Sequence, residues 1–253
     1  MRPTRRARDG LERPTRANVL NVFENDVAEG PSRPALTPKA ERTRASIREA
    51  ALRSFRENGF DATTMRKVAS DAGVSIGNAY YYFPTKTHLV QELYVEVQDA
   101  HRAAALPLLA GTTDLVERVG VVFRTGLDQL RPFHAYAPGF LTAMIAPESP
   151  LNPLSSESGP ARDITVGLFR EAVEGAKTPL PAEFAARMPQ ALWLGHLLLS
   201  LYWSYDRTDG QRRTGKLLDQ GLKLLKLGLP LTRMPVVRAP LRGLLDLVGE
   251  IGD

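Results

Sequence analysis

Residues 63–89, TTMRKVASDAGVSIGNAYYYFPTKTHL, decide the fold of this 253-residue chain. Apolar side chains recur at helical spacing up to Gly73, a residue type that readily takes the positive φ of a tight turn. Ser75 follows as a helix N-cap, and a short tyrosine-rich segment runs from it to a proline. The stretch therefore predicts a helix ending near residue 72, a turn, and a second helix over 75–82. Two helices joined in this way form a helix-turn-helix.

Longer helices are expected on either side of this motif. Thr37-Pro38 supplies an N-cap hydroxyl followed by proline at the first helical position, and the apolar stripe that follows ends at Gly59. Thr85 caps a further helix, which we expect Pro107 to stop.

Beyond these helices every periodic segment is again helical, and no run has the alternation of a strand. We expect helices near residues 113–131, 133–145, 160–175, 182–206, 210–228 and 238–250. A long polar loop is expected over 147–160. The predicted fold is all-α, with a basic disordered arm over 1–36, a helix-turn-helix domain over 37–84, and a helical effector-binding and dimerisation domain over 85–253.

The composition is that of an ordinary globular protein, with 43% apolar and 24% charged residues. The absence of cysteine excludes disulfides, thiol nucleophiles and cysteine-ligated metal sites. Residues 1–92 hold sixteen Lys and Arg against eleven acids, whereas residues 93–253 hold seventeen of each, so the net charge of +5 lies in the first third. This distribution favours a polyanion-binding module joined to a neutral domain; a merely solvated basic surface is the alternative.

The sequence lacks motifs for catalysis or membrane insertion. Its four histidines match no metal-ligand spacing, and it has no phosphate-binding glycine loop or nucleophile elbow, so we expect no enzyme activity, metal or cofactor. No apolar signal-peptide core follows the basic start. The longest apolar run, 191–203, is interrupted by His196 and Ser200 and is too short to span a bilayer. A cytoplasmic protein without membrane contact is the default expectation.

The short helix after the turn carries hydrogen-bonding groups that suit a DNA groove. Ser75, Asn78 and Tyr81 would present these groups to base edges from a helix lying in the major groove. Lys86 stands in the first turn of the next helix, where its charge and the helix dipole together favour a phosphate. These residues predict binding to double-stranded DNA.

The stretch resembles the signature of the tetracycline-repressor (TetR) family of transcriptional regulators. The matching parts are Thr63-Thr64, the Val-Ala-x-x-Ala-Gly-Val run, the Ala-Tyr-Tyr-Tyr-Phe run and Lys-x-x-Leu, and they cover about residues 40–92. The resemblance implies a homodimer on a palindromic operator, with half-sites about 34–36 Å apart. Carried over by position, it implies DNA contacts from Thr64, Ser75, Ile76, Gly77, Asn78, Tyr80, Tyr81, Tyr82 and Lys86.

In this resemblance Thr64, Tyr80 and Lys86 hold phosphates. Ile76 and Gly77 depart from the pattern, because a charged or long polar side chain would be expected there. Direct readout of bases would therefore be sparse and would depend partly on DNA shape.

Several of these roles have a structural alternative. Residues 80–82 are consecutive tyrosines about 100° apart on a helix, so at least one should belong to the core. Asn78 could merely occupy an exposed face, and Lys86 could be a solvated lysine. Phe83 matches a core position of the family, and the Arg-rich arm is more often a passive tail than a groove reader.

The last strong helices indicate an interface. Helix 182–206 is apolar around most of its circumference and needs cover on most sides, and helix 214–228 adds a run of leucines. In the TetR family the equivalent pair forms a four-helix bundle with its twofold mate. This implies a dimer interface at Leu199, Trp203, Leu218, Leu222 and Leu225, with burial inside one chain as the alternative.

The apolar interior of the later helices predicts a pocket for a medium-sized, partly hydrophobic effector. His196 is a polar candidate there, although an interior histidine is the commoner case. The predicted function is a repressor that leaves its operator when an effector binds, with helix 86–106 coupling the two sites. An activator, an effector-independent DNA binder and a helical protein–protein adaptor are the alternatives. Candidate pocket residues are His101, Phe123, Arg124, Leu127, Phe140, Met144, Phe169 and Trp193.

Overall fold

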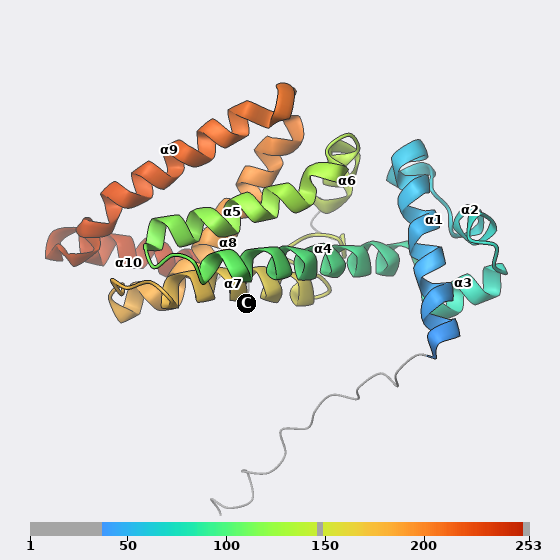
Figure 1. Cartoon of the computed structure of the whole chain (residues 1–253), viewed down its shortest axis with the longest axis horizontal. Coiled ribbons are helices and arrows are strands. Elements are labelled where there is room, and N and C mark those ends of the chain that lie inside the picture. Colours follow the sequence, from blue (N-terminus) through green and yellow to red (C-terminus); the bar gives the residue numbers. More distant parts are fainter. Residues whose placement is uncertain (1–36, 146–148, 250–253) are drawn as a thin grey trace, which may run out of the picture. The chain divides into compact units, whose positions relative to one another are not determined.

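The computed structural model describes residues 37–145 and 149–249, and within these ranges it contains helices and turns but no strand (Figure 1). The predicted all-α fold is confirmed. The predicted arm over 1–36 lies outside the described residues. The helices are α1 (Pro38–Ala62), α2 (Met65–Asp71), α3 (Ile76–Tyr82), α4 (Lys86–Leu109), α5 (Leu115–Leu130), α6 (Ala137–Ile145), α7 (Gly159–Glu174), α8 (Ala182–Tyr205), α9 (Arg212–Gly228) and α10 (Pro235–Gly249).

The turn between α2 and α3 has the geometry that the sequence predicts. Gly73 has a φ of +68°, and its N–H donates to Ser70 O at 3.1 Å. The Val74 N–H donates to Ala69 O at 3.0 Å, and the Val74 side chain packs against the core of α1–α3. Ser75 caps α3 by accepting from a backbone N–H. The turn therefore fixes the direction in which α3 leaves α2.

The core beneath this motif is built from fully buried apolar side chains of α1 to α4. Ile47 and Phe55 of α1, Val68 of α2 and Ala79 of α3 have no exposed surface, and Phe83 closes the cluster just after α3. Burial of the Ile47, Phe55, Val68 and Phe83 side chains is worth roughly 1.5–3 kcal/mol each, and the core that they form with Ala79 holds the short α3 in place.

One helix end agrees with the prediction and one differs. Within α1 the regular helix ends at Gly59, as predicted, because φ 80° and ψ 170° are not helical, and a short helical segment follows the kink to Ala62. α4 continues through Pro107 to Leu109. A proline in the last turn removes only one helical hydrogen bond, and the Ala110 N–H still donates to Leu106 O at 3.2 Å.

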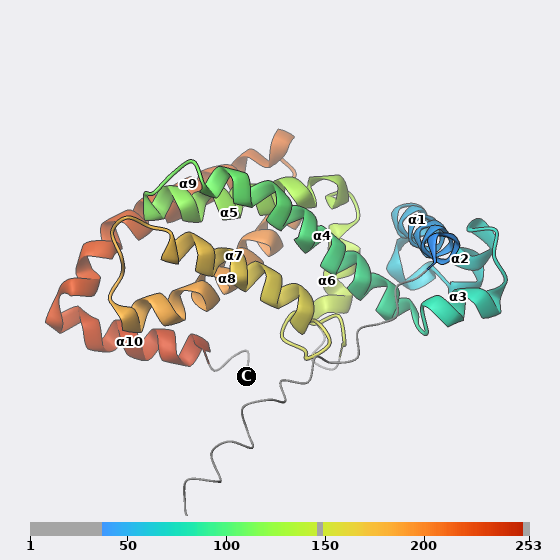
Figure 2. The ribbon, with the colours of Figure 1, turned by 60° about the horizontal axis from the view of Figure 1, so that its bottom comes forward.

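The helices from α4 onward enclose a second core. α4 lies alongside α5 and α7, as Figures 1 and 2 both show, and α8 packs against α7 and α10. Residues 149–158 form consecutive turns, and Leu151 within them is buried. The predicted loop thus contributes an apolar side chain to the interior.

A buried carboxylate fixes the junction between α8 and α9. Asp206 accepts hydrogen bonds from the backbone N–H and hydroxyl of Thr208 and from those of Thr214, at 2.6–3.0 Å. Burial alone raises the pKa of a carboxyl, but these four hydrogen bonds outweigh it and hold the pKa of Asp206 well below its usual range. The charged form therefore sets the angle at which α9 leaves α8.

We expect Gly73→Ala to lower the free energy of unfolding by about 1 kcal/mol, because a Cβ at positive φ is strained. Gly215→Ala is the matched control: Gly215 lies in α9, is exposed and has nothing within 4 Å of an added Cβ. That control should gain roughly 0.5–1 kcal/mol from helix propensity. Urea unfolding measures both, and equal stability of the Gly73 variant and the wild type would contradict the assignment.

Candidate nucleic-acid interface and interior cavity

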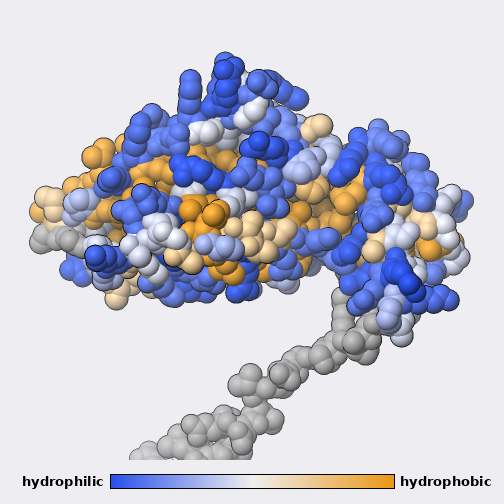
Figure 3. All heavy atoms as spheres, viewed as in Figure 1, coloured by the Kyte–Doolittle hydropathy of each residue, from blue (hydrophilic) through white to orange (hydrophobic). Residues whose placement is uncertain are grey.

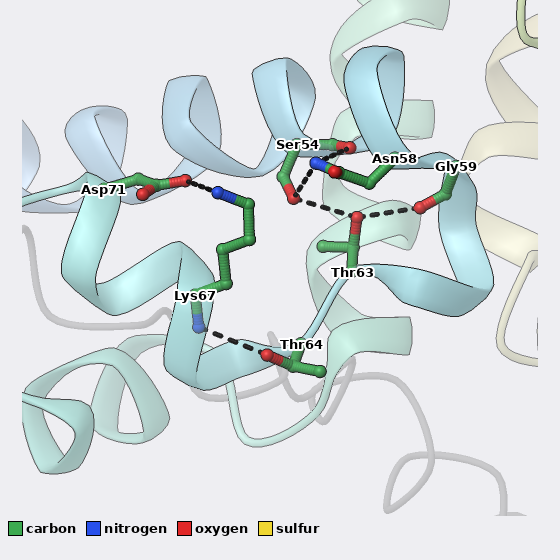
Figure 4. Close-up of polar contacts among 7 residues, drawn as sticks. All are labelled: Ser54, Asn58, Gly59, Thr63, Thr64, Lys67 and Asp71. Carbon is green, nitrogen blue, oxygen red and sulfur yellow. Dashed lines mark hydrogen bonds and ion pairs between the residues drawn. The ribbon is translucent and has the colours of Figure 1, made fainter.

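The corner between α1 and α2 is held by a chain of hydrogen bonds (Figure 4). Thr63 Oγ1 donates to Gly59 O at 2.8 Å, and because its hydrogen is used there, the Ser54 hydroxyl donates to Thr63 Oγ1 at 3.0 Å. Asn58 Nδ2 donates to Ser54 O at 3.2 Å. Thr63 is buried, so the first threonine of the pair is structural, whereas its neighbour Thr64 is exposed.

Thr64 is the N-cap of α2. Its hydroxyl accepts from the Lys67 N–H at 3.2 Å and keeps its own hydrogen for a further acceptor, such as a phosphate oxygen. The Lys67 ammonium lies 3.0 Å from Asp71 Oδ2, an exposed pair on the same helix (Figure 4).

Six of the predicted DNA-contact residues form one exposed surface on α3 and its N-cap. Tyr80 and Tyr81 are 48% and 77% exposed, and Ile76 is 41% exposed, which is unusual for side chains of this size. An exposed aromatic and aliphatic surface on a helix of a DNA-binding motif is available for a groove. The six residues are Ser75, Ile76, Gly77, Asn78, Tyr80 and Tyr81.

Tyr82 is the tyrosine that belongs to the core. It is half-buried against the α1–α3 cluster, and its ring meets that of Tyr81 edge-on at 5.2 Å. Phe83 is buried, as expected from its position after α3. Of the predicted tyrosine contacts, Tyr82 is therefore the least accessible.

The Lys86 ammonium is engaged inside the chain. It donates to Phe60 O at 2.6 Å and to Thr63 O at 3.1 Å, and it lies 4.0 Å from the centre of the Phe60 ring. Burial lowers the pKa of Lys86, against the attraction of Asp61. One of its three N–H donors remains for another partner, so a phosphate contact would share the ammonium with the end of α1.

An apolar cavity of about 550 Å³ lies among α4, α6, α8 and the turns at 149–158, with Leu52 of α1 in its wall. Of the predicted pocket residues, Phe140 and Met144 line it. Its polar lining residues include Tyr94, Gln98, His196, Ser200 and Ser204.

Six predicted pocket residues lie elsewhere. Arg124 is exposed and forms an ion pair with Asp219 of α9 at 3.0 Å, which ties α5 to α9 instead of facing an interior space. The other five fill the packed core of the α4–α9 helices, because their rings and methyl groups occupy the space that a ligand would need. These are His101, Phe123, Leu127, Phe169 and Trp193.

Two histidines meet between this core and the cavity. The rings of His101 and His196 are stacked with centres 5.9 Å apart, and His101 Nε2 donates to Val122 O at 2.9 Å. An added Cβ on Gly126 would lie 2.5 Å from the His196 ring, so only glycine fits there. Burial, together with the neighbouring His101, lowers the pKa of His196 to about 3. His196 is therefore neutral at physiological pH.

The five predicted dimer residues are covered within one chain. Leu199, Trp203, Leu218 and Leu222 are buried, and Leu225 is half-buried against the same core. These positions correct the predicted interface, because they form the inner faces of α8 and α9. The leucines and tyrosines exposed on the same helices are Leu198, Tyr202, Tyr205, Leu217, Leu224 and Leu227.

The structure defines a class: helical proteins with an N-terminal helix-turn-helix and a C-terminal helical domain. The sequence profile described as "Bacterial regulatory proteins, tetR family" matches residues 47–93. A second profile, "Tetracyclin repressor-like, C-terminal domain", matches residues 118–251, which is more than half of the chain. The chain belongs to the TetR family of transcriptional regulators.

Curated relatives match mainly through a short segment. The HTH-type transcriptional repressor KstR2 of Mycobacterium tuberculosis is 30% identical over 92 residues, which are 36% of this chain and 46% of that protein. The HTH-type transcriptional regulator TtgR of Pseudomonas putida is 41% identical over 63 residues, 25% of this chain and 30% of that protein. The chain thus covers less than half the length of both relatives.

Solved structures share the fold. A TetR regulator from Nitrosomonas europaea has a TM-score of 0.56 at 16% identity, covering 72% of this chain and 96% of that one. The Thermus thermophilus FadR repressor, solved in complex with lauroyl-CoA, has a TM-score of 0.56 at 22% identity. The match covers 74% of this chain and 94% of the FadR chain.

In the described part of the chain, no three His, Asp or Glu side chains are grouped as a metal site would need. None of the described helices is both long enough and apolar enough to cross a membrane.

Sequence reasoning missed Tyr94, Gln98 and Ser200 as cavity residues. The sequence did indicate Ser200. Together with His196 it interrupts an apolar run, and a spacing of four residues puts both on one face of α8. Tyr94 and Gln98 have the same spacing on α4, but nothing in the sequence says which face of α4 turns inward.

The low pKa of His196 makes stability depend on pH. The unfolded chain binds a proton near pH 6.5 and the folded chain only near 3, so stability is full above about 6.5 and falls as the pH drops toward 3. The slope reaches about 1.4 kcal/mol per pH unit. Urea unfolding of the wild type and His196→Gln between pH 7 and 5 measures it, and parallel curves for the two proteins would contradict the buried neutral histidine.

Proposed function

We propose that this protein is a homodimeric repressor that binds a palindromic DNA operator through α3 and leaves it when a small molecule occupies the cavity. The observation that carries the DNA-binding part is the exposed surface of α3, with Tyr80, Tyr81 and Asn78 accessible on a helix that Gly73 and Ser75 hold in a fixed direction. A rigid, exposed helix with hydrogen-bonding side chains suits a major groove.

The contacts fall into two groups. Thr64, at the N-cap of α2, and Tyr80 hold phosphates and position the motif. Asn78 and Tyr81 reach base edges, while Ile76 supplies apolar contact, for which a thymine methyl group is the natural partner. Since only a few polar groups reach the bases, the deformability of the operator contributes to its selection.

The dimer forms through the outer faces of α8 and α9. Leu198, Leu224 and Leu227 are 67%, 69% and 72% exposed on one chain, and a second chain is the simplest cover for them. Hydrophobic surface is visible across the C-terminal helices in Figure 3, between hydrophilic side chains. A twofold axis would bring the same residues of both chains together.

The cavity is suited to act on the DNA-binding motif because the two share residues. Phe140 lines the cavity, and its ring meets Phe55 edge-on at 5.4 Å and Phe60 at 5.7 Å. Leu52 of α1 also lines it. A ligand that moves Phe140 therefore acts on the α1–α2 corner as well as through α4, which begins at Lys86 beneath the same corner.

Operator binding tests the α3 assignment. Binding sites are first selected from random double-stranded DNA, and affinities are then measured by gel shift. Tyr80→Ala should weaken binding by about tenfold through loss of one phosphate hydrogen bond, without changing the melting temperature, because Tyr80 is half-exposed. Selection of no sequence above background by the folded protein would refute the proposal.

Lys86→Ala separates two roles in the same assay. If Lys86 contacts a phosphate, its removal makes the log–log dependence of affinity on salt shallower by about one unit. If Lys86 only makes contacts inside the chain, the variant is less stable and the slope is unchanged. Lys177→Ala is the control for loss of an exposed lysine outside the helix-turn-helix.

Sedimentation tests the dimer. Leu224→Asp/Leu227→Asp should sediment as a monomer, because charged groups would face each other in an apolar interface; both leucines are exposed on α9 and neither lines the cavity. Leu108→Asp is the control, since Leu108 is a comparably exposed leucine on α4. A dimer that persists in the double variant would place the interface elsewhere.

A further inference from the structure

In the described part of the chain, the wall of the cavity holds no charged group. Its lining holds leucines, valines and aromatic rings, and none of its described lining residues is Lys, Arg, Asp or Glu. An ion entering it would give up its hydration without gaining an opposite charge. The wall therefore selects against ionised ligands.

The guanidinium of Arg162, near the cavity, makes its contacts within the chain. Arg162 donates through Nη1 to Pro153 O and Ser155 O, both at 3.3 Å, and its guanidinium lies 6.0 Å from the centre of the Trp193 ring. These contacts hold the turns that precede α7. Burial raises the pKa of Tyr94 to about 12 although Arg162 opposes this, so the phenol in the wall is also neutral.

Some polar groups of the wall are already satisfied. Ser204 Oγ donates to Leu201 O at 2.7 Å, within α8. Gln98 Oε1 accepts from Thr165 Oγ1 at 2.7 Å, and Gln91 Nε2 donates to Pro150 O at 2.9 Å. The Ser204 hydroxyl, the Gln98 side-chain oxygen and the Gln91 side-chain nitrogen therefore already have partners within the chain.

Two groups of the described wall are not satisfied. His196 Nδ1 and Ser200 Oγ are buried and have no hydrogen-bond partner among the residues that the structure describes, and His196 as a whole is 95% buried. They lie one turn apart on α8, so both belong to the same side of the helix and to the same cavity wall. Buried polar groups are almost always hydrogen-bonded, and an unsatisfied pair beside an open space calls for a polar atom from outside.

We propose that the cavity binds an uncharged lipophilic molecule whose hydroxyl or carbonyl oxygen meets Ser200 and His196. This rests on the proposed function, because the molecule would be the effector. The Ser200 hydroxyl donates to that oxygen, and the neutral imidazole either donates to it or accepts from a ligand hydroxyl. The apolar remainder of the ligand fills the space against Phe140 and Met144.

Calorimetric titration of the full-length protein at pH 7.5 tests the charge selectivity. The probes are 1-dodecanol, 2-dodecanone and dodecanoate, which share a chain length and differ in the polar group. At least one of the two neutral probes should bind at least tenfold more tightly than the carboxylate, and the alcohol and ketone arms distinguish the two oxygen functions. Equal or tighter binding of dodecanoate, or no binding of either neutral probe, would overturn the proposal.

A matched pair of variants tests the polar contact. Ser200→Ala should weaken the better neutral probe about five- to tenfold, while the melting temperature of the ligand-free protein stays the same or rises, because an unpartnered buried hydroxyl is removed. Ser204→Ala changes the same group one turn away, where the hydroxyl is already bonded, and should change affinity less than twofold. Equal affinity of Ser200→Ala and wild type would overturn the assignment of Ser200.

The experiments distinguish failure of the ligand proposal from failure of the proposed repressor function. If the neutral probe binds with the expected selectivity but does not release operator DNA in a gel shift, effector release fails and the ligand assignment stands. If dodecanoate binds best and releases the DNA, the ligand assignment fails and the proposed function stands.

Discussion

The Lys86 ammonium joins the first residue of α4 to the end of α1, two segments separated by more than twenty residues of sequence. Carbonyls at a helix end lack intrahelical partners, and a lysine can satisfy them. Here the contacts with Phe60 O and Thr63 O, together with the Phe60 ring, fix where α4 begins relative to the α1–α2 corner. Because α3 follows that corner through the turn at Gly73, the Lys86 contact acts together with the turn and the buried core to position the exposed helix.

The α1–α2 corner also contacts a residue that lines the cavity. Phe60 lies between Lys86 on one side and Phe140 on the other, and Phe140 lines the cavity. Aromatic rings in edge-on or tilted contact are stiff and well packed, so a displacement of one ring is passed to its neighbours. Phe140 thus contacts both the cavity and the α1–α2 corner.

Local features of this fold could be predicted from the sequence, because they depend on neighbouring residues. Thr37, Ser75 and Thr85 all cap helices as expected, and Gly73 has the predicted positive φ. These positions need only the preferences of an N-cap hydroxyl and of glycine. The order and type of the helices followed from periodicity in the same way.

Positions that depend on distant partners could not be predicted. α8 is apolar on most sides, so its pattern did not say that Leu199 and Trp203 are buried while Leu198 and Tyr202 are exposed. Packing against other helices, chiefly α7 and α10, decides this. Similarly, the sequence showed that Lys86 is charged and placed at a helix start, but not that Phe60 and Thr63 carbonyls lie beside it.

The path from cavity to corner places a condition on any effector. A ligand shifts the protein between two arrangements only as far as it binds one more tightly than the other. In the arrangement described here, Phe140 packs against Phe55 and Phe60, and Ser200 and His196 have no partner. A ligand that satisfies the two polar groups but leaves Phe140 in place gains affinity without favouring a second arrangement. If the proposed release by an effector operates, it therefore requires an occupant large enough to fill the space beside Phe140 as well as to reach α8.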